Sequence, residues 1–159
     1  MSKITPFLWF NDNAEEAINL YTSIFKESKI GKMARYDEAG AKASGRPAGS
    51  VMTATFSLFG QEFIALNGGP HFKFTEAISF VVSCETQEEI DHYWNNLTKN
   101  GGQESQCGWL KDRFGLSWQI VPATLSKLLS DPKTSQAVMK AMLSMKKIDI
   151  TALENAAGR

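Results

Sequence analysis

Apolar residues along the first seventy positions predict one strand, one helix and three further strands. The run 5–10 is apolar at nearly every position, as expected for a strand that is covered on both faces. From Ala14 to Phe25, apolar residues recur at the spacing of an amphipathic helix, and Asn13 stands at its N-cap. Three further strands are expected, at 32–37, 51–58 and 63–66. The segment 39–50 contains three glycines, one proline and two serines, which predicts a mobile loop.

The same order of patterns returns after residue 76. A strand is expected over 77–84, and Thr86-Gln87-Glu88-Glu89 has the spacing of a capping box at the start of a helix. The buried side of that helix is expected to consist of Ile90, Tyr93, Trp94 and Leu97. Asn100-Gly101-Gly102 ends the helix. Three strands are expected to follow, at 104–108, 109–112 and 116–121.

These two halves form an internal repeat. Phe59-Gly60 matches Phe114-Gly115 at an offset of 55, and the helix caps Asn13 and Thr86 are offset by 73. The difference of 18 is about the size of the loop at 39–50, which only the first half carries. The prediction is therefore an α+β fold of two βαβββ modules in a single domain, 1–159. Module one spans 1–70, module two spans 71–122, and leucine and methionine patterns predict a helical extension over 123–159.

Composition and charge narrow the classes of partner. The 17 basic side chains equal the 17 acidic ones, so the chain has no charge excess for nucleic acid or an anionic membrane. No apolar run approaches the length of a membrane span, and the N-terminus has no signal-peptide pattern. Cys84 and Cys107 do not form a CxxC pair, and reduced thiols in a cytoplasmic protein are expected.

Several motifs carry a resemblance to a known family. The stretches 6–10 (PFLWF), 67–70 (NGGP), 74–80 (FTEAISF) and 107–112 (CGWLKD) look like the PhnB-like branch of the vicinal oxygen chelate superfamily. That superfamily includes glyoxalase I, bleomycin-resistance proteins and extradiol dioxygenases, and this branch is often labelled 3-demethylubiquinone-9 3-methyltransferase-like. The resemblance implies paired modules that enclose a cup-shaped cavity for a small-molecule ligand, usually in a homodimer.

The resemblance also implies where a metal would bind in related enzymes. Four ligands on the first and last strands of each module would fall at Pro6, at Ile64 or Leu66, at Ala77 and at Gln119. Apart from the amide of Gln119, these side chains have no donor atom for a cation, whereas Zn²⁺ and Fe²⁺ require several. The prediction is a protein with no metal site and no cofactor.

Gln119 is the polar residue expected to face the cavity, where its amide would orient a ligand carbonyl or amide. The alternative is a cross-strand hydrogen bond within the sheet. Ser79 and Ser117 should point the same way by the strand period of two, either to bind the ligand or to leave room for it. The aromatic residues Trp9, Phe56 and Trp109 are expected to line an apolar pocket, although Trp9 could instead pack outward against a helix.

Two further residues allow two interpretations each. Cys107 is either a nucleophile or a buried and inert thiol, and no activating base lies near it in the sequence. His71 follows Gly68-Gly69-Pro70 and either acts as an acid or base at the mouth of the cup or is a structural histidine.

These expectations lead to one main hypothesis: a cytoplasmic, metal-free, homodimeric protein that encloses a small, partly apolar molecule. The first alternative is an enzyme of the same superfamily, of the transferase, lyase or isomerase type, that uses Gln119 or His71. The second is an interaction protein whose cavity is filled by its own side chains. The methyltransferase label finds no support in the sequence, because no glycine-rich strand-to-helix turn opens either predicted helix.

Overall fold

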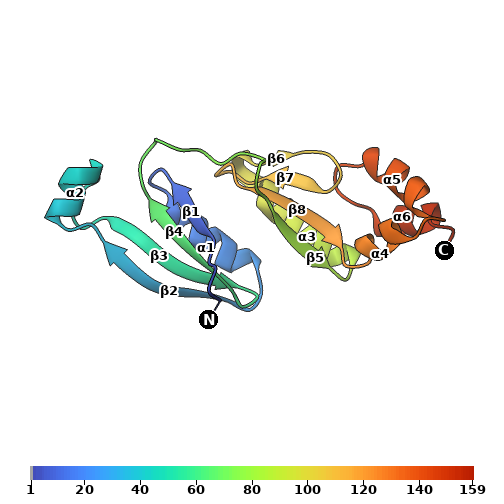
Figure 1. Ribbon diagram of the computed structural model, residues 1–159, viewed down its shortest axis with the longest axis horizontal. Helices are drawn as coiled ribbons and strands as arrows, with labels where there is room; N and C mark the ends of the chain where they lie inside the picture. Colours follow the sequence, from blue (N-terminus) through green and yellow to red (C-terminus); the bar gives the residue numbers. More distant parts are fainter. Residues whose placement is uncertain (1) are drawn as a thin grey trace. The chain divides into compact units, whose positions relative to one another are not determined.

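The computed structural model describes residues 2–159 and contains two four-stranded sheets, each with one long helix against it (Figure 1). The chain divides into two compact units, one ending at Phe74 and the other spanning Thr75–Arg159. Phe72 and Phe74 belong to the first unit, where their rings pack on Trp9 and Phe10 at centroid distances of 4.9 and 5.2 Å.

The first unit has the order strand, helix, strand, short helix, strand, strand. Its elements are β1 (Phe7–Phe10), α1 (Ala14–Ile24), β2 (Ser28–Arg35), α2 (Glu38–Ser44), β3 (Val51–Leu58) and β4 (Gln61–Asn67). The strands lie in the order β1-β4-β3-β2, with β1 parallel to β4 and the other pairs antiparallel.

The second unit repeats this topology. It contains β5 (Phe80–Cys84), α3 (Gln87–Thr98), a short 3₁₀ turn η1 (Lys99–Gly101), β6 (Gln103–Glu104), β7 (Trp109–Lys111) and β8 (Ser117–Pro122). The order is β5-β8-β7-β6, and β5 is parallel to β8 as β1 is to β4. Gly60 and Gly115 take φ values of +77° and +88° in the matching turns. The predicted α+β fold of two βαβββ modules is confirmed.

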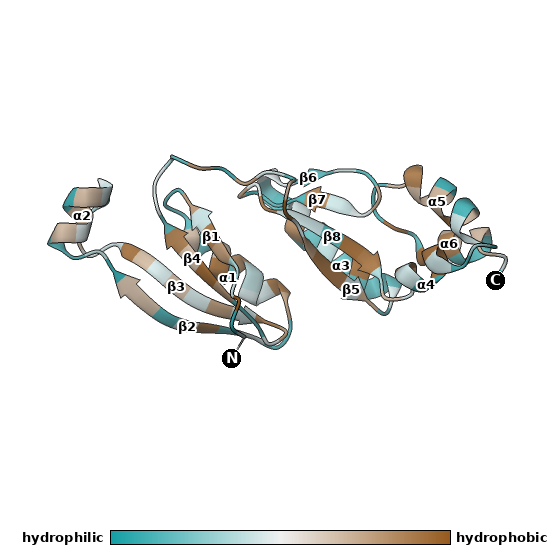
Figure 2. Ribbon diagram, in the orientation of Figure 1, coloured by the Kyte–Doolittle hydropathy of each residue, from teal (hydrophilic) through white to brown (hydrophobic). Residues whose placement is uncertain are grey.

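The core of each unit lies between the helix and one face of its sheet. The ribbons of β4 and β5 are mostly brown, the colour of apolar residues (Figure 2). In the first unit, Ile18 and Tyr21 of α1 are fully buried. In the second unit, Ile90, Trp94 and Leu97 of α3 are buried in the same way. The predicted buried side of the second helix is confirmed.

The structure corrects three local predictions. The segment 39–50 is not a loop throughout, because Asp37 accepts a hydrogen bond from the amide of Gly40 (2.6 Å) and caps the helix α2. Asn13 is at the N-cap of α1, but its side chain makes no capping hydrogen bond. The strand expected from residue 77 begins only at Phe80, with Ile78 58% exposed.

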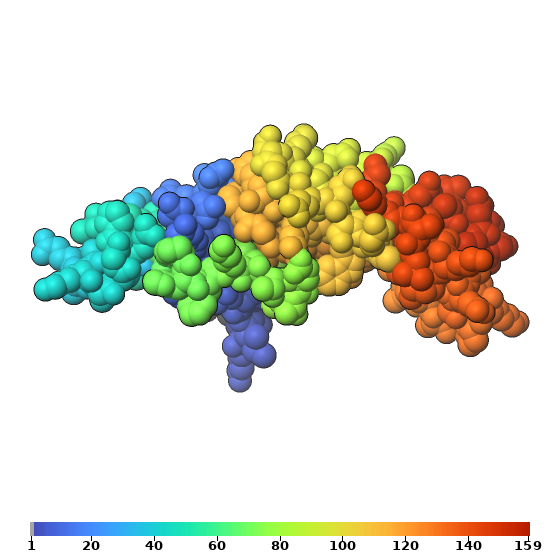
Figure 3. All heavy atoms as spheres, turned by 90° about the horizontal axis from the view of Figure 1, so that it is seen from above, coloured from blue at the N-terminus to red at the C-terminus, as the bar shows by residue number. Residues whose placement is uncertain are grey.

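The predicted helical extension is present as α4 (Leu125–Ser130), α5 (Ser135–Leu143) and α6 (Ile150–Ala156). Its buried side chains include Leu128, Val138 and Leu153, so the three helices share a small core. In the space-filling view, these residues form an orange and red lobe at the end of the second unit (Figure 3). Over residues 2–159, none of the helices has the length and apolar character that crossing a bilayer requires.

Candidate functional site

The face of each sheet that points away from its helix, called here the distal face, carries the candidate site. Side chains alternate between the two faces along a strand. In the second unit, Trp118 and Ile120 are buried on the helix side, which places Ser117 and Gln119 on the distal face. Trp109 pairs with Gln119 and Lys111 pairs with Ser117, so these two side chains of β7 share that face.

Gln119 is half-buried at the centre of the distal face, between Val81 of β5 and Trp109 of β7. Its Nε2 donates a hydrogen bond to Ser79 Oγ at 2.9 Å. This hydrogen bond joins β8 to the residue that precedes β5, so it is close to the cross-strand hydrogen bond of the alternative interpretation. The carbonyl oxygen of the Gln119 amide has no hydrogen-bond partner among residues 2–159 and is left to accept from another molecule.

Ser117 is buried, with 1% of its surface exposed, and its Oγ has no hydrogen-bond partner within the described part of the chain. Leaving a buried hydroxyl unsatisfied costs about 1–3 kcal/mol. Such a group in a folded protein therefore calls for an explanation, such as an ordered water or a ligand. Ser117 lies two residues before Gln119 and opposite Lys111, so the unsatisfied hydroxyl shares its face with an amide and an ammonium group.

Lys111 adds a positive charge that the sequence analysis did not assign to the site. Its Nζ forms an ion pair with Glu76, and the two side chains are 35% and 60% exposed. The hydrogen bond from Lys111 lowers the pKa of the Glu76 carboxyl. The signal was available in the sequence, because Lys111 lies two residues after Trp109 on the same predicted strand and must share its face.

Trp109 begins β7, and Cys107 lies two residues before it. The indole of Trp109 is half-buried. Cys107 is half-buried in the turn before the strand, with a φ of +59°, and its amide donates to Met145 O at 2.9 Å. Cys84, by contrast, is buried on the helix side of β5, and burial raises the pKa of its thiol to about 12. An unreactive thiol at Cys84 follows from that environment.

The distal face of the first unit is apolar only along β1 and β4. Trp9 pairs with Leu66, and Phe7 pairs with Ile64, which brings four apolar side chains together. β3 adds polar side chains to the same face, because Thr53 pairs with Leu66 and Thr55 pairs with Ile64. The indole of Trp9 is fixed, since its Nε1 donates to Gly69 O at 2.9 Å. A Cβ on Gly68 would lie 2.3 Å from the indole ring, so only glycine fits beneath it.

Trp9, Phe56 and His71 belong to the first unit and do not join the second distal face. Phe56 has 3% of its surface exposed, and its ring stacks on Phe63 at 5.1 Å on the helix side of the first sheet. The pairing of β3 places this ring towards α1, and a role in ligand binding stays a prediction. His71 is exposed and lies in the first unit, after Pro70.

The distal faces do not fit a divalent cation. In the first unit, Phe7 and Trp9 of β1 lie on the distal face, because Leu8 and Phe10 occupy the helix side. In the second unit, Ala77 precedes β5, and Val81 of β5 lies beside Gln119. None of these side chains supplies a metal donor. Among residues 2–159, no group of three or more His, Cys, Asp and Glu side chains is placed to hold a metal ion.

The first unit also contains a shallow hollow of about 140 Å³ at the edge formed by β2, β3 and β4. It is lined by Lys29, Gly31, Thr55, Phe56, Ser57 and Glu62. A Cβ on Gly31 would lie 2.2 Å from Thr55 Oγ1, and the amide of Lys32 donates to that oxygen at 2.8 Å. The hollow is therefore a consequence of the irregular pairing of β2 with β3 near residue 31.

Comparison with known proteins agrees with this architecture. The family model for 3-demethylubiquinone-9 3-methyltransferase matches residues 2–121. The PhnB protein from Bacillus cereus is 42% identical, with a TM-score of 0.68 over 77% of this chain and 100% of that chain. Among curated proteins, no match was found.

More distant solved structures share the fold. Protein PA1353 from Pseudomonas aeruginosa is 21% identical, with a TM-score of 0.60 over 77% of this chain and 98% of that chain. The fosfomycin resistance protein FosX from Listeria monocytogenes, solved with Mn(II) and sulfate, is 14% identical, with a TM-score of 0.54 over 81% of this chain and 96% of that chain. The chain belongs to the 3-demethylubiquinone-9 3-methyltransferase-like, or PhnB-like, family of the vicinal oxygen chelate superfamily.

Proposed function

We propose that the protein binds a small, partly apolar molecule on the distal face of its second sheet, without a metal ion. The observation that carries this proposal is the buried hydroxyl of Ser117, which has no hydrogen-bond partner among residues 2–159. Ser117 lies opposite Lys111 and two residues before Gln119. A ligand oxygen at this point would accept one hydrogen bond from Ser117 and another from Lys111. The bond from Lys111 would be the stronger of the two, because its donor is charged. Trp109 offers an apolar surface for the remainder of the ligand.

The donor set of the site supports a metal-free mode of binding. One amide, hydroxyl groups and an ammonium group recognise a carbonyl, amide or carboxylate, whereas a divalent cation requires several oxygen, nitrogen or sulfur ligands. The methyltransferase name of the family does not supply a mechanism here. β1 leads into α1 through Asn11–Asn13, and β5 leads into α3 through Glu85 and Thr86, with no glycine in either connection.

The proposal includes a homodimer in the cytoplasm. Apolar side chains such as Phe7 and Val81, which are 55% and 59% exposed on the distal faces, support a second copy or a ligand that covers them. Both cysteines are free, which fits a reducing compartment. Light scattering should give twice the chain mass of 17.6 kDa, and a strictly monomeric protein would contradict the dimer.

Binding is tested by thermal shift on chelator-treated protein with a panel of small carboxylates and amides, headed by benzoate and benzamide. We expect benzoate-type acids to stabilise the wild type. In Lys111→Met, affinity should fall by a factor of about 10–150, since a charge-assisted hydrogen bond contributes about 1.5–3 kcal/mol. Lys29→Met removes a lysine of the first unit and serves as the matched control. Equal binding by Lys111→Met and wild type, or no stabilisation by any member of the panel, would contradict the proposal.

A further inference from the structure

The helical extension lies outside the part of the chain that the family shares. The family match ends at residue 121, and the Bacillus cereus PhnB protein is covered completely by 77% of this chain. A segment of this extension, Met145–Ile150, nevertheless makes close contacts with the family domain of the second unit. We call this segment the strap.

The strap accepts two main-chain hydrogen bonds from the turn that precedes Trp109. The amide of Cys107 donates to Met145 O at 2.9 Å, and the amide of Gly108 donates to Lys146 O at 2.8 Å. Ile148 is fully buried, and a Cβ on Gly108 would lie 3.1 Å from Ile148 Cγ1. The turn and the strap are therefore in direct contact, and glycine at 108 permits that approach.

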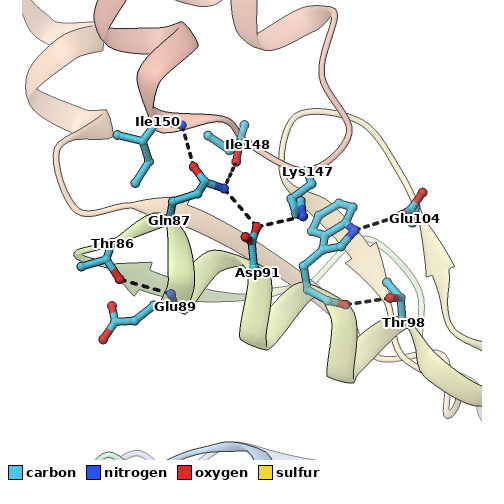
Figure 4. Close-up of polar contacts among 10 residues, drawn as sticks. Thr86, Gln87, Glu89, Asp91, Thr98, Glu104, Lys147, Ile148 and Ile150 are labelled. Atoms are coloured by element: carbon cyan, nitrogen blue, oxygen red, sulfur yellow. Dashed lines mark hydrogen bonds and ion pairs between the residues drawn. The ribbon is translucent and has the colours of Figure 1, made fainter.

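Gln87 fastens the other part of the strap to α3 (Figure 4). Its Nε2 donates to Ile148 O at 3.0 Å and to Asp91 Oδ1 at 3.2 Å, and its Oε1 accepts from the amide of Ile150 at 2.9 Å. Asp91 in turn pairs with Lys147 Nζ at 2.8 Å. One glutamine side chain thus donates to a main-chain carbonyl of the strap and accepts from a main-chain amide of the strap, as the backbone of a neighbouring strand would.

The turn held by the strap is strained. Cys107 has a φ of +59°, a left-handed conformation that costs a residue other than glycine about 1–2 kcal/mol. Such strain persists where surrounding contacts enforce it. Here the enforcing contacts are the strap carbonyls on one side and β8 on the other, where Gly108 O accepts from Ile120 N at 2.8 Å. Without the strap, the amides of Cys107 and Gly108 would lose their partners and the turn would be free to relax.

We propose that the strap sets the position of Trp109 in the ligand site, so that residues outside the family domain control binding. Trp109 directly follows Gly108 and pairs with Gln119 on the distal face. A displaced turn would therefore displace the aromatic surface from the polar groups of the site. This inference rests on the proposed function for its effect on binding, but its structural part is independent of any ligand.

The test compares Gln87→Ala with Glu88→Ala, a control at the adjacent exposed position of the same helical turn. The first readout is the NMR resonance of the Trp109 indole N–H, assigned with Trp109→Phe. The second is the rate at which a disulfide reagent modifies Cys107, since the buried Cys84 with its raised pKa reacts slowly. Of the three hydrogen bonds lost in Gln87→Ala, two join the strap, and at about 1 kcal/mol each they predict a roughly 30-fold faster reaction.

In Gln87→Ala we expect a shifted Trp109 resonance, a faster Cys107 reaction and weaker benzoate binding, whereas Glu88→Ala should match the wild type. Asp91→Asn, which removes only the ion pair to Lys147, should change both structural readouts in the same direction by a smaller amount and provides the test if Gln87→Ala does not fold. An unmoved Trp109 resonance or an unchanged Cys107 reaction rate would contradict the proposal that the strap sets the position of Trp109. If benzoate fails to bind the wild type while both structural readouts change, the proposed function fails and the strap stands.

Discussion

The two units of the chain have the same strand order but differ in how each helix begins. In the first unit, the amide of Ala14 at the start of α1 donates to Asn67 Oδ1 at 2.9 Å, from the end of β4. In the second unit, Thr86 accepts from the amide of Glu89, within the same turn. One helix start therefore depends on the folded sheet, and the other is encoded locally.

Their distal faces differ as well. The first has apolar side chains around Trp9, which Gly68 and Gly69 hold in place, and threonine hydroxyls on β3. The second presents Gln119, Ser117 and Lys111. The two modules thus share their backbone pairing but differ in the side chains of this face. Only the second face combines an amide with an ammonium group, which favours the second unit for the proposed ligand site.

The largest expected effect comes from replacing Asn67, the residue of β4 that caps α1 in the first unit. Asn67 is 8% exposed, caps α1 through Oδ1 and donates to Val51 O at 3.1 Å, so Asn67→Ala leaves two buried main-chain groups without a partner. We expect a loss of about 3 kcal/mol in the free energy of unfolding, measured with urea. Asn67→Asp keeps the acceptor but not the donor. A loss below 1 kcal/mol in Asn67→Ala would contradict this stabilising role of Asn67.

A second difference concerns alkaline stability, because both cysteines lie in the second unit. The pKa of the Cys84 thiol is raised by burial to about 12, above its unfolded value near 9. Its contribution to stability is therefore fully present below pH 9 and is lost as the pH rises to about 12. The slope should reach at most about 1.4 kcal/mol per pH unit. Urea unfolding of Cys84→Ala between pH 9 and 11 should show a flatter dependence, and an unchanged slope would refute this assignment.

The smallest effect is expected at the local cap of the second unit. Thr86→Ala removes the hydrogen bond that Thr86 Oγ1 accepts from the amide of Glu89. The cost should be about 1 kcal/mol, because the freed amide is exposed and can bind water. Thr86→Ser keeps the oxygen and should restore most of the stability. If Thr86→Ala costs as much as Asn67→Ala, the contrast between a local and a tertiary cap disappears.

The repeat could be predicted from the sequence because it depends on local sequence patterns. Helical spacing, the capping sequence after Thr86 and the glycines at 60 and 115 each act over a few residues. Period-two alternation also places Ser117 and Gln119 on one face, as observed. In contrast, the cap supplied by Asn67 joins positions 53 apart, and nothing near Asn13 signals it.

Misjudged elements also have physical causes. Glycine and proline content suggested a loop at 39–50, but the capping carboxylate of Asp37 and three alanines suffice for two helical turns. The strand expected from residue 77 begins only at Phe80, because the alternation of apolar residues does not show where pairing with β8 starts. The contacts of Gln87 with the strap could not be predicted, because Gln87 belongs to a capping sequence, where a glutamine is expected to be solvent-exposed.

The most direct test of the account is an NMR titration of chelator-treated protein with benzamide, whose N–H can donate to Gln119 Oε1, in the wild type and in Gln119→Ala. We predict binding to the wild type with no metal added, and an affinity about fivefold lower in Gln119→Ala, as expected for one lost hydrogen bond. Binding that appears only after addition of Mn²⁺ or Zn²⁺, or that is unchanged in Gln119→Ala, would contradict a metal-free site on the second sheet.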